Sequence, residues 1–258
     1  MLFEPKTTLS MSPQTNHSLS VDCVIFGFDG NSLKVLLVRR DFVNGVGMPV
    51  VDYKLPGDMI YENEDLRSSA YRTLGKYAST RDIYLRQMHV FSHPDRVSGD
   101  ELKWLNEYYH VNTTRVVTVV YYSLVKLNRR LLVSVEEKGA RWFDVESVCR
   151  LAMDHKQILA RALEVLAKQF LAEPIAFELL PRKFTLRQLQ SLYEAILGIE
   201  IDNRNFRKKV LSSDYIRATG EKEKNVAHKP AMYYTFDKSK FMKDNRLKFR
   251  LNFINWQV

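Results

Sequence analysis

Two apolar runs near the start of the chain have the pattern of neighbouring β-strands. Residues 21–28 and 33–39 are mostly apolar, and the Asp29-Gly30 pair between them is a turn signal. Together they predict a largely buried β-hairpin. Residues 115–125 are β-branched or aromatic almost throughout and predict the strongest strand of the chain. Shorter strands are expected at residues 88–91, 131–135 and 140–143.

Apolar positions at helical spacing predict two helices in the same part of the chain. They recur every four residues over residues 66–74, after a Pro-Gly turn, and a second amphipathic stretch runs from Asp154 to just before Pro174. Strands and helices in this mixed order predict an α/β sandwich over residues 21–172. Residues 1–20 are rich in Ser, Thr, Pro and Asn without periodicity, and they predict a disordered tail.

The last third of the chain, residues 173–258, has a different pattern. Thr185 and Gln188 form a capping box that opens an amphipathic helix, Gly198 ends that helix, and a second helix follows Asp202. Two further segments, 215–219 and 232–236, predict strands on either side of a basic loop that carries Lys222, Lys224, His228 and Lys229. Helix, turn, basic helix and basic hairpin is the order of a winged helix-turn-helix domain.

Charge is distributed unevenly between these two parts. The whole chain has 39 Lys+Arg, 30 Asp+Glu and a net charge of +9. Residues 174–258 contain 17 Lys+Arg and 9 Asp+Glu, a balance of +8, so residues 1–173 carry only +1. A polyanionic partner is therefore expected at the C-terminal part.

The basic helix after Asp202 is the expected DNA-reading element, although a solvated charged face is the alternative. Arginine and asparagine can contact guanine and adenine edges in the major groove. The residues expected to lie near base edges are Asn203, Arg204, Asn205, Arg207 and Lys208. Those expected to contact phosphates are Arg182, Lys183, Arg187, Lys209, Lys222, Lys224 and Lys229.

Composition excludes several other classes of protein. The two cysteines, Cys23 and Cys149, are too few for a metal cluster or a disulfide framework. No apolar run approaches the roughly 18 residues of a membrane span, and the N-terminus lacks the pattern of a signal peptide. We therefore expect a cytoplasmic protein without a bound metal or cofactor and without a membrane partner.

The segment from Asp58 to Tyr77 resembles the Nudix box, in which helix carboxylates bind divalent cations that activate water. Glu64 and Arg72 match that motif. Its helix glutamates, however, are replaced by Thr73, Lys76 and Tyr77, at positions that share one helical face. The resemblance therefore implies a Nudix-like fold that is not an enzyme. A Nudix hydrolase with an atypical metal site is the alternative.

The chain as a whole resembles the Nudix-related transcriptional regulators, which pair a non-catalytic Nudix-like sensor domain with a C-terminal winged helix-turn-helix. Three segments carry this resemblance: 151–155, 173–190 and 202–209. It is closest to the Bacteroidetes branch, which includes sugar-responsive regulators of pentose use, while other members sense an ADP-ribose-type nucleotide. It implies a homodimer that binds operator DNA and responds to a sugar or sugar-phosphate first, or a nucleotide sugar second.

The cleft beside the Nudix-like helix is the expected effector site, with a scaffold helix that binds nothing as the alternative. The candidate effector-binding residues are Asp58, Glu64, Arg72, Thr73, Lys76, Tyr77, Arg96 and Arg115. The last two either bind the ligand or brace a loop. The family usually has Gly-Gly where this chain has Gly57-Asp58, and residues 98–114 are an insertion. Both departures lie around the cleft, so they leave the effector open.

Two further sets of residues have a structural and a functional interpretation. Asp154 and His155 have the residue types of a catalytic pair, but their place at the start of a helix favours a cap and a packing residue at the domain joint. Trp104, Tyr108 and Tyr109 are expected to pack or to contact a second copy rather than to stack on a ligand.

Overall fold

The computed structural model describes residues 14–78, 83–224, 226–227 and 229–244. Its first domain is built on a sheet in which the neighbouring strands follow the order β3-β2-β1-β6-β5, with β4 also paired to β1 and β7 to β2. The central pair, β1 and β6, is parallel, and the other pairs are antiparallel. The strands are β1 (Thr15–Phe28), β2 (Leu33–Val43), β3 (Pro49–Lys54), β4 (Gly57–Tyr61), β5 (Tyr84–Phe91), β6 (Val117–Lys126) and β7 (Ala140–Asp144).

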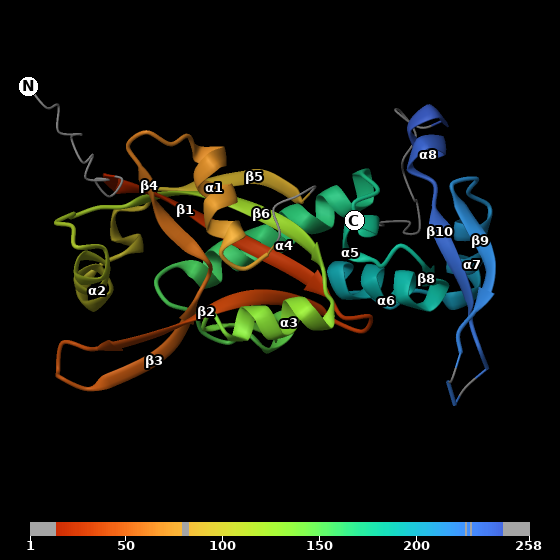
Figure 1. Ribbon diagram of the computed structural model, residues 1–258, viewed down its shortest axis with the longest axis horizontal. Helices are drawn as coiled ribbons and strands as arrows, with labels where there is room; N and C mark the ends of the chain where they lie inside the picture. Colours follow the sequence, from red (N-terminus) through yellow and green to blue (C-terminus); the bar gives the residue numbers. More distant parts are fainter. Residues whose placement is uncertain (1–13, 79–82, 225, 228, 245–258) are drawn as a thin grey trace, which may run out of the picture.

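Helices cover both faces of this sheet (Figure 1). Side chains of α1 (Leu66–Gly75) and α3 (Arg129–Glu136) pack with alternate residues of β1 on one face, and α4 (His155–Ala172) packs on the other. The alternation of β1 side chains between two cores is the reason that nearly all of its apolar run is buried. The domain is the expected α/β/α Nudix-like sandwich. An additional helix, α2 (Gly99–Tyr109), lies at one end of it.

The second domain is the expected winged helix-turn-helix. The Thr185 hydroxyl accepts from the backbone N–H of Gln188, whose side chain accepts from the Thr185 N–H, and Gly198 ends the helix in the left-handed conformation. The strands form one sheet in the order β8-β10-β9. The elements are α5 (Ala176–Leu179), β8 (Phe184–Thr185), α6 (Leu186–Leu197), α7 (Asn203–Leu211), β9 (Ile216–Lys222), β10 (Met232–Phe236) and α8 (Lys238–Asp244).

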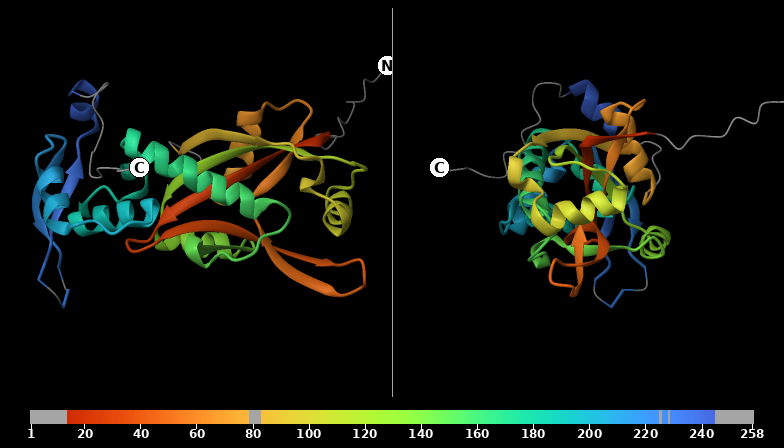
Figure 2. Two further views of the ribbon diagram at one scale, coloured as in Figure 1. Left: turned by 180° about the vertical axis from the view of Figure 1, so that it is seen from behind. Right: turned by 90° about the vertical axis from the view of Figure 1, so that its left-hand side faces the viewer.

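One helix belongs to the cores of both domains. In Figure 2, α4 runs along the sheet toward the winged domain. The Phe170 ring near its C-terminal end lies 4.5 Å from the Tyr193 ring of α6 in an edge-on arrangement. Tyr193 in turn lies 6.0 Å from Phe206 of α7. A continuous set of buried apolar side chains therefore joins the sheet of the first domain to α7.

The structure corrects several of the expected elements. Residues 131–135 are helical rather than a strand, because the Asn128 side chain caps α3 by accepting from the Leu131 N–H. The tail boundary at residue 20 was wrong, since residues 15–20 are already part of β1 and pair with β4 and β6. Strands β3 and β4 were not expected, and the 98–114 insertion contains α2.

Some sequence predictions fall on residues outside the described ones, namely residues 1–13, His228 and residues 245–258. Among the helices that the structure describes, none is both long enough and apolar enough to cross a membrane.

Candidate functional site

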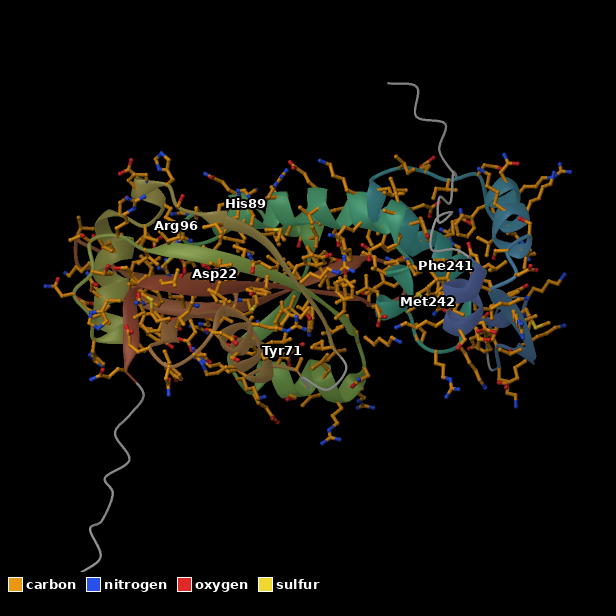
Figure 3. All side chains as sticks on the ribbon, turned by 90° about the horizontal axis from the view of Figure 1, so that it is seen from above. Asp22, Tyr71, His89, Arg96, Phe241 and Met242 are labelled. Atoms are coloured by element: carbon orange, nitrogen blue, oxygen red, sulfur yellow. The ribbon has the colours of Figure 1, made fainter. Side chains whose placement is uncertain are left out.

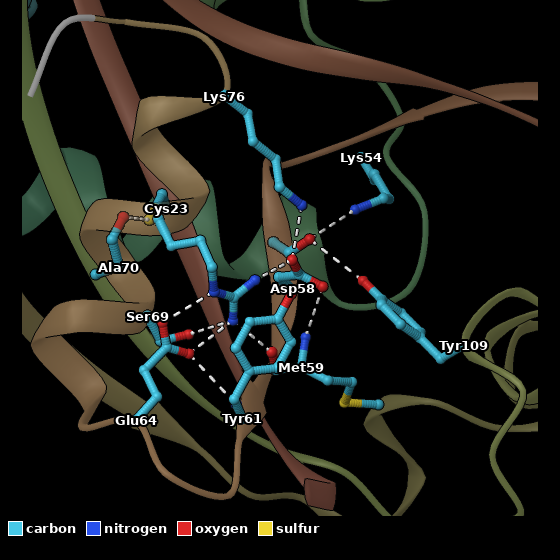
Figure 4. Close-up of polar contacts among 12 residues, drawn as sticks. Cys23, Lys54, Asp58, Met59, Tyr61, Glu64, Ser69, Ala70, Lys76 and Tyr109 are labelled. Atoms are coloured by element: carbon cyan, nitrogen blue, oxygen red, sulfur yellow. Dashed lines mark hydrogen bonds and ion pairs between the residues drawn. The ribbon is translucent and has the colours of Figure 1, made fainter. Parts of the chain in front are cut away.

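Arg72 of α1 is the centre of an ion-pair network with Asp58 and Glu64, and Figure 4 shows these two carboxylates close to Lys76 and Tyr61. Its guanidinium binds the Asp58 carboxylate and donates to both Glu64 oxygens, at 2.9 and 2.8 Å. It also stacks over the Tyr61 ring at 3.9 Å. The Lys76 ammonium lies 2.7 Å from Asp58. Four of the expected residues therefore meet, but they bind one another.

The charges of this network control the protonation of its carboxylates. Burial alone would raise the pKa of Asp58, but the neighbouring Lys76 ammonium and Arg72 guanidinium outweigh it and hold that pKa below its ordinary value. The hydrogen bond from Arg72 likewise lowers the pKa of Glu64. Both carboxylates are thus ionised at neutral pH.

A second, more deeply buried network lies beside the first. Arg96 is 7% exposed and donates to Asp154 at 2.9 and 2.8 Å, and its guanidinium lies 3.7 Å from Asp22 of β1. Figure 3 shows Asp22 and Arg96 close together in the sensor domain, far from Phe241. Asp154 stands at the N-cap position of α4, but its carboxylate makes no cap hydrogen bond. The charge of Arg96 therefore anchors the start of α4.

His155 accepts a hydrogen bond rather than acting in a catalytic pair. Its Nδ1 accepts from the backbone N–H of Leu55 at 2.9 Å, which requires the neutral ring, and its Nε2 lies 3.8 Å from Asp22. The side chain is 2% exposed. Burial lowers the pKa of His155 to about 4. It is a packing residue, as expected, although its partner is the loop before β4.

This burial predicts an acid-sensitive contribution to stability. Between about pH 6.5 and 4 the unfolded chain binds a proton at His155 that the folded chain does not, so the free energy of unfolding falls as the pH is lowered through this window. The loss reaches about 3 kcal/mol at its limit. His155→Gln keeps an acceptor for Leu55. Urea denaturation at pH 7 and pH 4.5 should show about 2–3 kcal/mol less acid destabilisation in this variant than in the wild type. Equal losses in both proteins would contradict the assignment.

A small, partly open cavity lies between Asp58 of the first network, Asp22 and Arg96 of the second, and α2. Tyr109 of α2 donates to the Gly57 carbonyl at 3.3 Å, and the ammonium of the half-buried Lys54 lies 3.5 Å from the same oxygen. Burial lowers the pKa of Lys54 and raises that of Tyr109 well above 10. The cavity measures about 30 Å³ and is lined by Ser20, Asp22, Lys54, Gly57, Asp58, Met59, Arg96, Trp104, Leu105, Tyr109, Val116, Met153 and His155.

Gly57 is required at this point by close contact. A Cβ at Gly57 would lie 1.9 Å from the Asp22 carboxylate and 3.2 Å from the Val21 carbonyl. Asp58, which replaces the second glycine of the family pattern, has room for its side chain and supplies the carboxylate between the two networks. The departure from Gly-Gly therefore adds a charged group next to the cavity.

The described residues do not offer a divalent-metal site. Positions 73, 76 and 77 carry a hydroxyl, an ammonium and a phenol, and Lys76 neutralises Asp58. No group of three or more His, Cys, Asp or Glu side chains suited to a metal ion occurs in the part of the chain that the structure describes. The residues present therefore do not fit the cations of the Nudix reaction.

The basic face that is expected to bind DNA lies on α7. Phe206 and Val210 are buried against the rest of the winged domain, which turns the opposite side of the helix to solvent. The Asp202 carboxylate caps the helix by accepting from the Asn205 N–H at 2.8 Å. The exposed side chains of this face are Asn203, Arg204, Asn205, Arg207, Lys208 and Lys209.

Comparisons with known proteins agree with this architecture. Residues 176–236 match the family model described as the NrtR DNA-binding winged helix domain. The ADPR responsive transcriptional repressor of Acinetobacter baylyi is 26% identical over 223 residues, which cover 84% of this chain and 81% of the repressor. The crystal structure of Shewanella oneidensis NrtR complexed with a 27mer DNA is 28% identical, covers 84% of this chain and 93% of that chain, and has a TM-score of 0.65.

The chain is an NrtR-like, Nudix-related regulator with a winged helix DNA-binding domain.

This likeness to NrtR decides between the two functions left open by the sequence. The protein is a DNA-binding transcriptional regulator and not a hydrolase, because the relatives that it matches over most of their length are NrtR regulators. A MutT/nudix family protein from Enterococcus faecalis, 21% identical with a TM-score of 0.58 over 88% of each chain, shares the fold.

Not all of the expected effector residues reach the cavity of this NrtR-like domain. Asp58 and Arg96 line it, whereas Glu64, Arg72 and Lys76 lie behind Asp58. Thr73 is 1% exposed on the packed side of α1. Tyr77 faces a different groove, and burial raises its pKa to about 12. Arg115 donates to the Ser92 carbonyl at 3.0 Å, so it braces the loop.

Several cavity residues were missed from the sequence. The main ones are Ser20, Asp22, Lys54 and Tyr109. A signal existed for Asp22, because a carboxylate inside an apolar strand requires a partner when it is buried. Lys54 and Tyr109 carry no such signal, because Lys54 precedes a loop and Tyr109 belongs to the insertion at residues 98–114.

The expected phosphate contacts are also distributed unevenly. Lys183 is paired with Glu221 of β9 at 2.7 Å. Arg187 lies 3.6 Å from Glu194 and lines a groove that faces the sensor domain rather than the α7 face. The residues exposed on the winged domain away from that groove are Arg182, Lys222, Lys224 and Lys229.

Proposed function

We propose that this regulator binds operator DNA as a cytoplasmic homodimer and that a small sugar bound in the sensor cavity modulates this binding. The observation that carries the proposal is α4. His155 at its start lines the cavity, its N-cap residue Asp154 binds the cavity residue Arg96, and Phe170 near its other end packs on the helix that supports α7. One rigid element therefore links the candidate effector site to the DNA-reading helix.

The charges around the cavity favour an uncharged, hydroxyl-rich ligand. Four carboxylates meet four cations there, so the formal charges cancel; the groups are Asp22, Asp58, Glu64 and Asp154 with Lys54, Arg72, Lys76 and Arg96. A diphosphate requires excess cations or bound metal ions. Sugar hydroxyls can both donate to carboxylates and accept from ammonium groups, so they add no uncompensated charge.

The aromatic wall of the cavity fits the same ligand class. Trp104 and Tyr109 of α2 line one side, and apolar ring faces pack well on the C–H face of a sugar. A cavity of about 30 Å³ has room for about one water molecule, so a sugar enters only when α2 moves outward. Binding would then alter the contacts of α2 and the position of Asp154 together, because Glu101 of α2 accepts from the Met153 N–H.

ADP-ribose is the second candidate effector. It is favoured by the Acinetobacter baylyi relative, whose name describes it as ADPR responsive. For this chain to bind such a diphosphate, the Asp58 carboxylate would have to release Arg72 and Lys76. The two candidates therefore differ in how much of the existing network must open.

Operator binding in the presence of each candidate tests the proposal. Fluorescence anisotropy with DNA from the upstream region of the protein's own operon is measured alone, with pentoses and hexoses, with pentose phosphates, and with ADP-ribose. We expect specific binding that one sugar changes by tenfold or more. A response only to ADP-ribose would replace the sugar by the second candidate. Absence of specific DNA binding at moderate salt would refute the function itself.

Ligand-induced stability provides an independent measurement. An effector at 100 times its dissociation constant should raise the free energy of unfolding by about 2.7 kcal/mol. Trp104→Ala removes an aromatic wall of the cavity and should abolish most of this gain, whereas Tyr108→Ala, at a 61% exposed neighbouring position, should retain it. If no sugar or nucleotide changes the stability of the wild type, the protein is a regulator without an effector in this cavity.

A further inference from the structure

The hairpin formed by the end of β2 and by β3 has two chemically different faces. Register pairs Arg39 with Tyr53, Asp41 with Val51 and Val43 with Pro49, so these residues share one side. We call it the outer face, together with the turn residues Val46 and Met48. Its apolar members Val43, Val46, Met48 and Val51 are 63%, 80%, 59% and 56% exposed.

The inner face of the same hairpin is firmly anchored to α2. Arg40, 3% exposed, is held between Asp52 and Glu101, and its guanidinium lies 4.4 Å from the Phe42 ring and 4.7 Å from the Trp104 ring. At the turn, Gly45 donates to Asp100 at 2.9 Å. The apolar outer face is therefore presented on a fixed support, which lowers the entropy cost of binding a partner.

The hairpin is placed where a partner can reach it. It projects from the body of the sensor domain, and β3 forms the edge of the sheet (Figure 1). Exposed apolar residues that gather on an edge strand are unfavourable in a monomer and mark an interaction site. Single exposed apolar residues elsewhere, such as Val90 at 43%, form no comparable group with their neighbours.

Charge indicates that the partner is a second copy of the chain. At the base of the outer face, Arg39 and Asp41 are paired with each other and are 55% and 58% exposed, so two copies of this face meet without excess like charge. Residues 1–173 carry a balance of +1, whereas residues 174–258 carry +8. Two copies therefore repel least when they associate through the sensor domain. A two-fold contact requires such a self-complementary patch.

We propose that the outer face of the β2–β3 hairpin is the contact through which two copies associate. The four apolar side chains form its centre, and the Arg39–Asp41 pairs lie at its rim. This interface rests on the homodimer of the proposed function. It can be tested by measuring self-association in the absence of DNA and effector.

Sedimentation equilibrium of the full chain tests this contact. The wild type should be dimeric at micromolar concentration, and Val51→Lys should weaken the dimer at least tenfold because it places like charges face to face. Val90→Lys on β5 is the matched control, since it adds the same charge at an exposed valine outside the hairpin. Far-ultraviolet circular dichroism of both variants should match the wild type, because both side chains are exposed and their replacement leaves the fold intact.

Two outcomes would overturn the interface. In the first, the wild type remains monomeric at a protein concentration on the order of 100 micromolar. In the second, the dimer of Val51→Lys dissociates no more readily than the dimer of the wild type or of Val90→Lys. A dimer that depends on Val51 while the wild type binds no operator would support the interface and contradict the proposed function. The two ideas therefore fail separately.

Discussion

Replacing Arg204 and Arg207 of α7 together by alanine is expected to weaken operator binding by about 100-fold or more. Both side chains are exposed on the face of α7 opposite to the buried Phe206 and Val210. A bidentate arginine contact to a base contributes roughly 1–3 kcal/mol of discrimination, so two such losses correspond to about this change. Anisotropy titrations with operator and with unrelated DNA at one fixed salt concentration measure it.

The matched control removes the same charge elsewhere. Arg161→Ala with Lys168→Ala alters two exposed basic residues of α4, outside the winged domain. If the loss of affinity arises from net charge alone, this control should weaken binding as strongly as the α7 pair. We expect less than a threefold change, and we expect the α7 pair to reduce the preference for operator over unrelated DNA. Equal effects of both pairs would show that α7 does not read bases.

Replacing Arg96 by leucine is expected to destabilise the sensor domain by about 3–5 kcal/mol. The guanidinium is almost fully buried and donates to Asp154 at 2.8 and 2.9 Å, so its removal leaves a buried carboxylate without compensation. Urea denaturation followed by circular dichroism measures the change. Arg115→Leu, at an exposed arginine that braces the Ser92 carbonyl, should cost less than about 1.5 kcal/mol.

A second substitution separates charge burial from loss of packing. In Arg96→Leu with Asp154→Leu, no unpaired charge from this ion pair remains, so much of the lost stability should return. If the double variant is no more stable than Arg96→Leu alone, the cost arises from packing around the guanidinium. In that case the Arg96–Asp154 pair is not what anchors the start of α4.

The sequence predicted the elements whose pattern is local. The apolar runs at 21–28 and 33–39, the capping box at Thr185 and the basic helix after Asp202 all have the structure that their residues indicate. Segment 131–135 was assigned wrongly because its apolar residues alternate only in part, and the Asn128 cap decided in favour of a helix. The start of β1 was missed because polar residues 15–20 are ordered by pairing with distant strands rather than by their own pattern.

The candidate site could be predicted only in outline. Asp58, Glu64, Arg72 and Lys76 do come together, because positions on one helical face and a neighbouring strand are close in any Nudix-like fold. Which of them face the cavity depends on long-range packing. Thr73 shares a helical face with Lys76 in the sequence pattern, yet Thr73 is buried in the structure while Lys76 is exposed.

The sequence by itself determined the two-domain organisation, the basic helix after Asp202 and the loss of the Nudix carboxylates, since composition, periodicity and motif positions record these directly. Only the tertiary structure decided that Arg72 and Lys76 bind Asp58 and that α2 closes the cavity. It also decided that α4 joins the cavity to the winged domain. Those features depend on which buried charges meet, and burial brings together residues that are far apart in the chain.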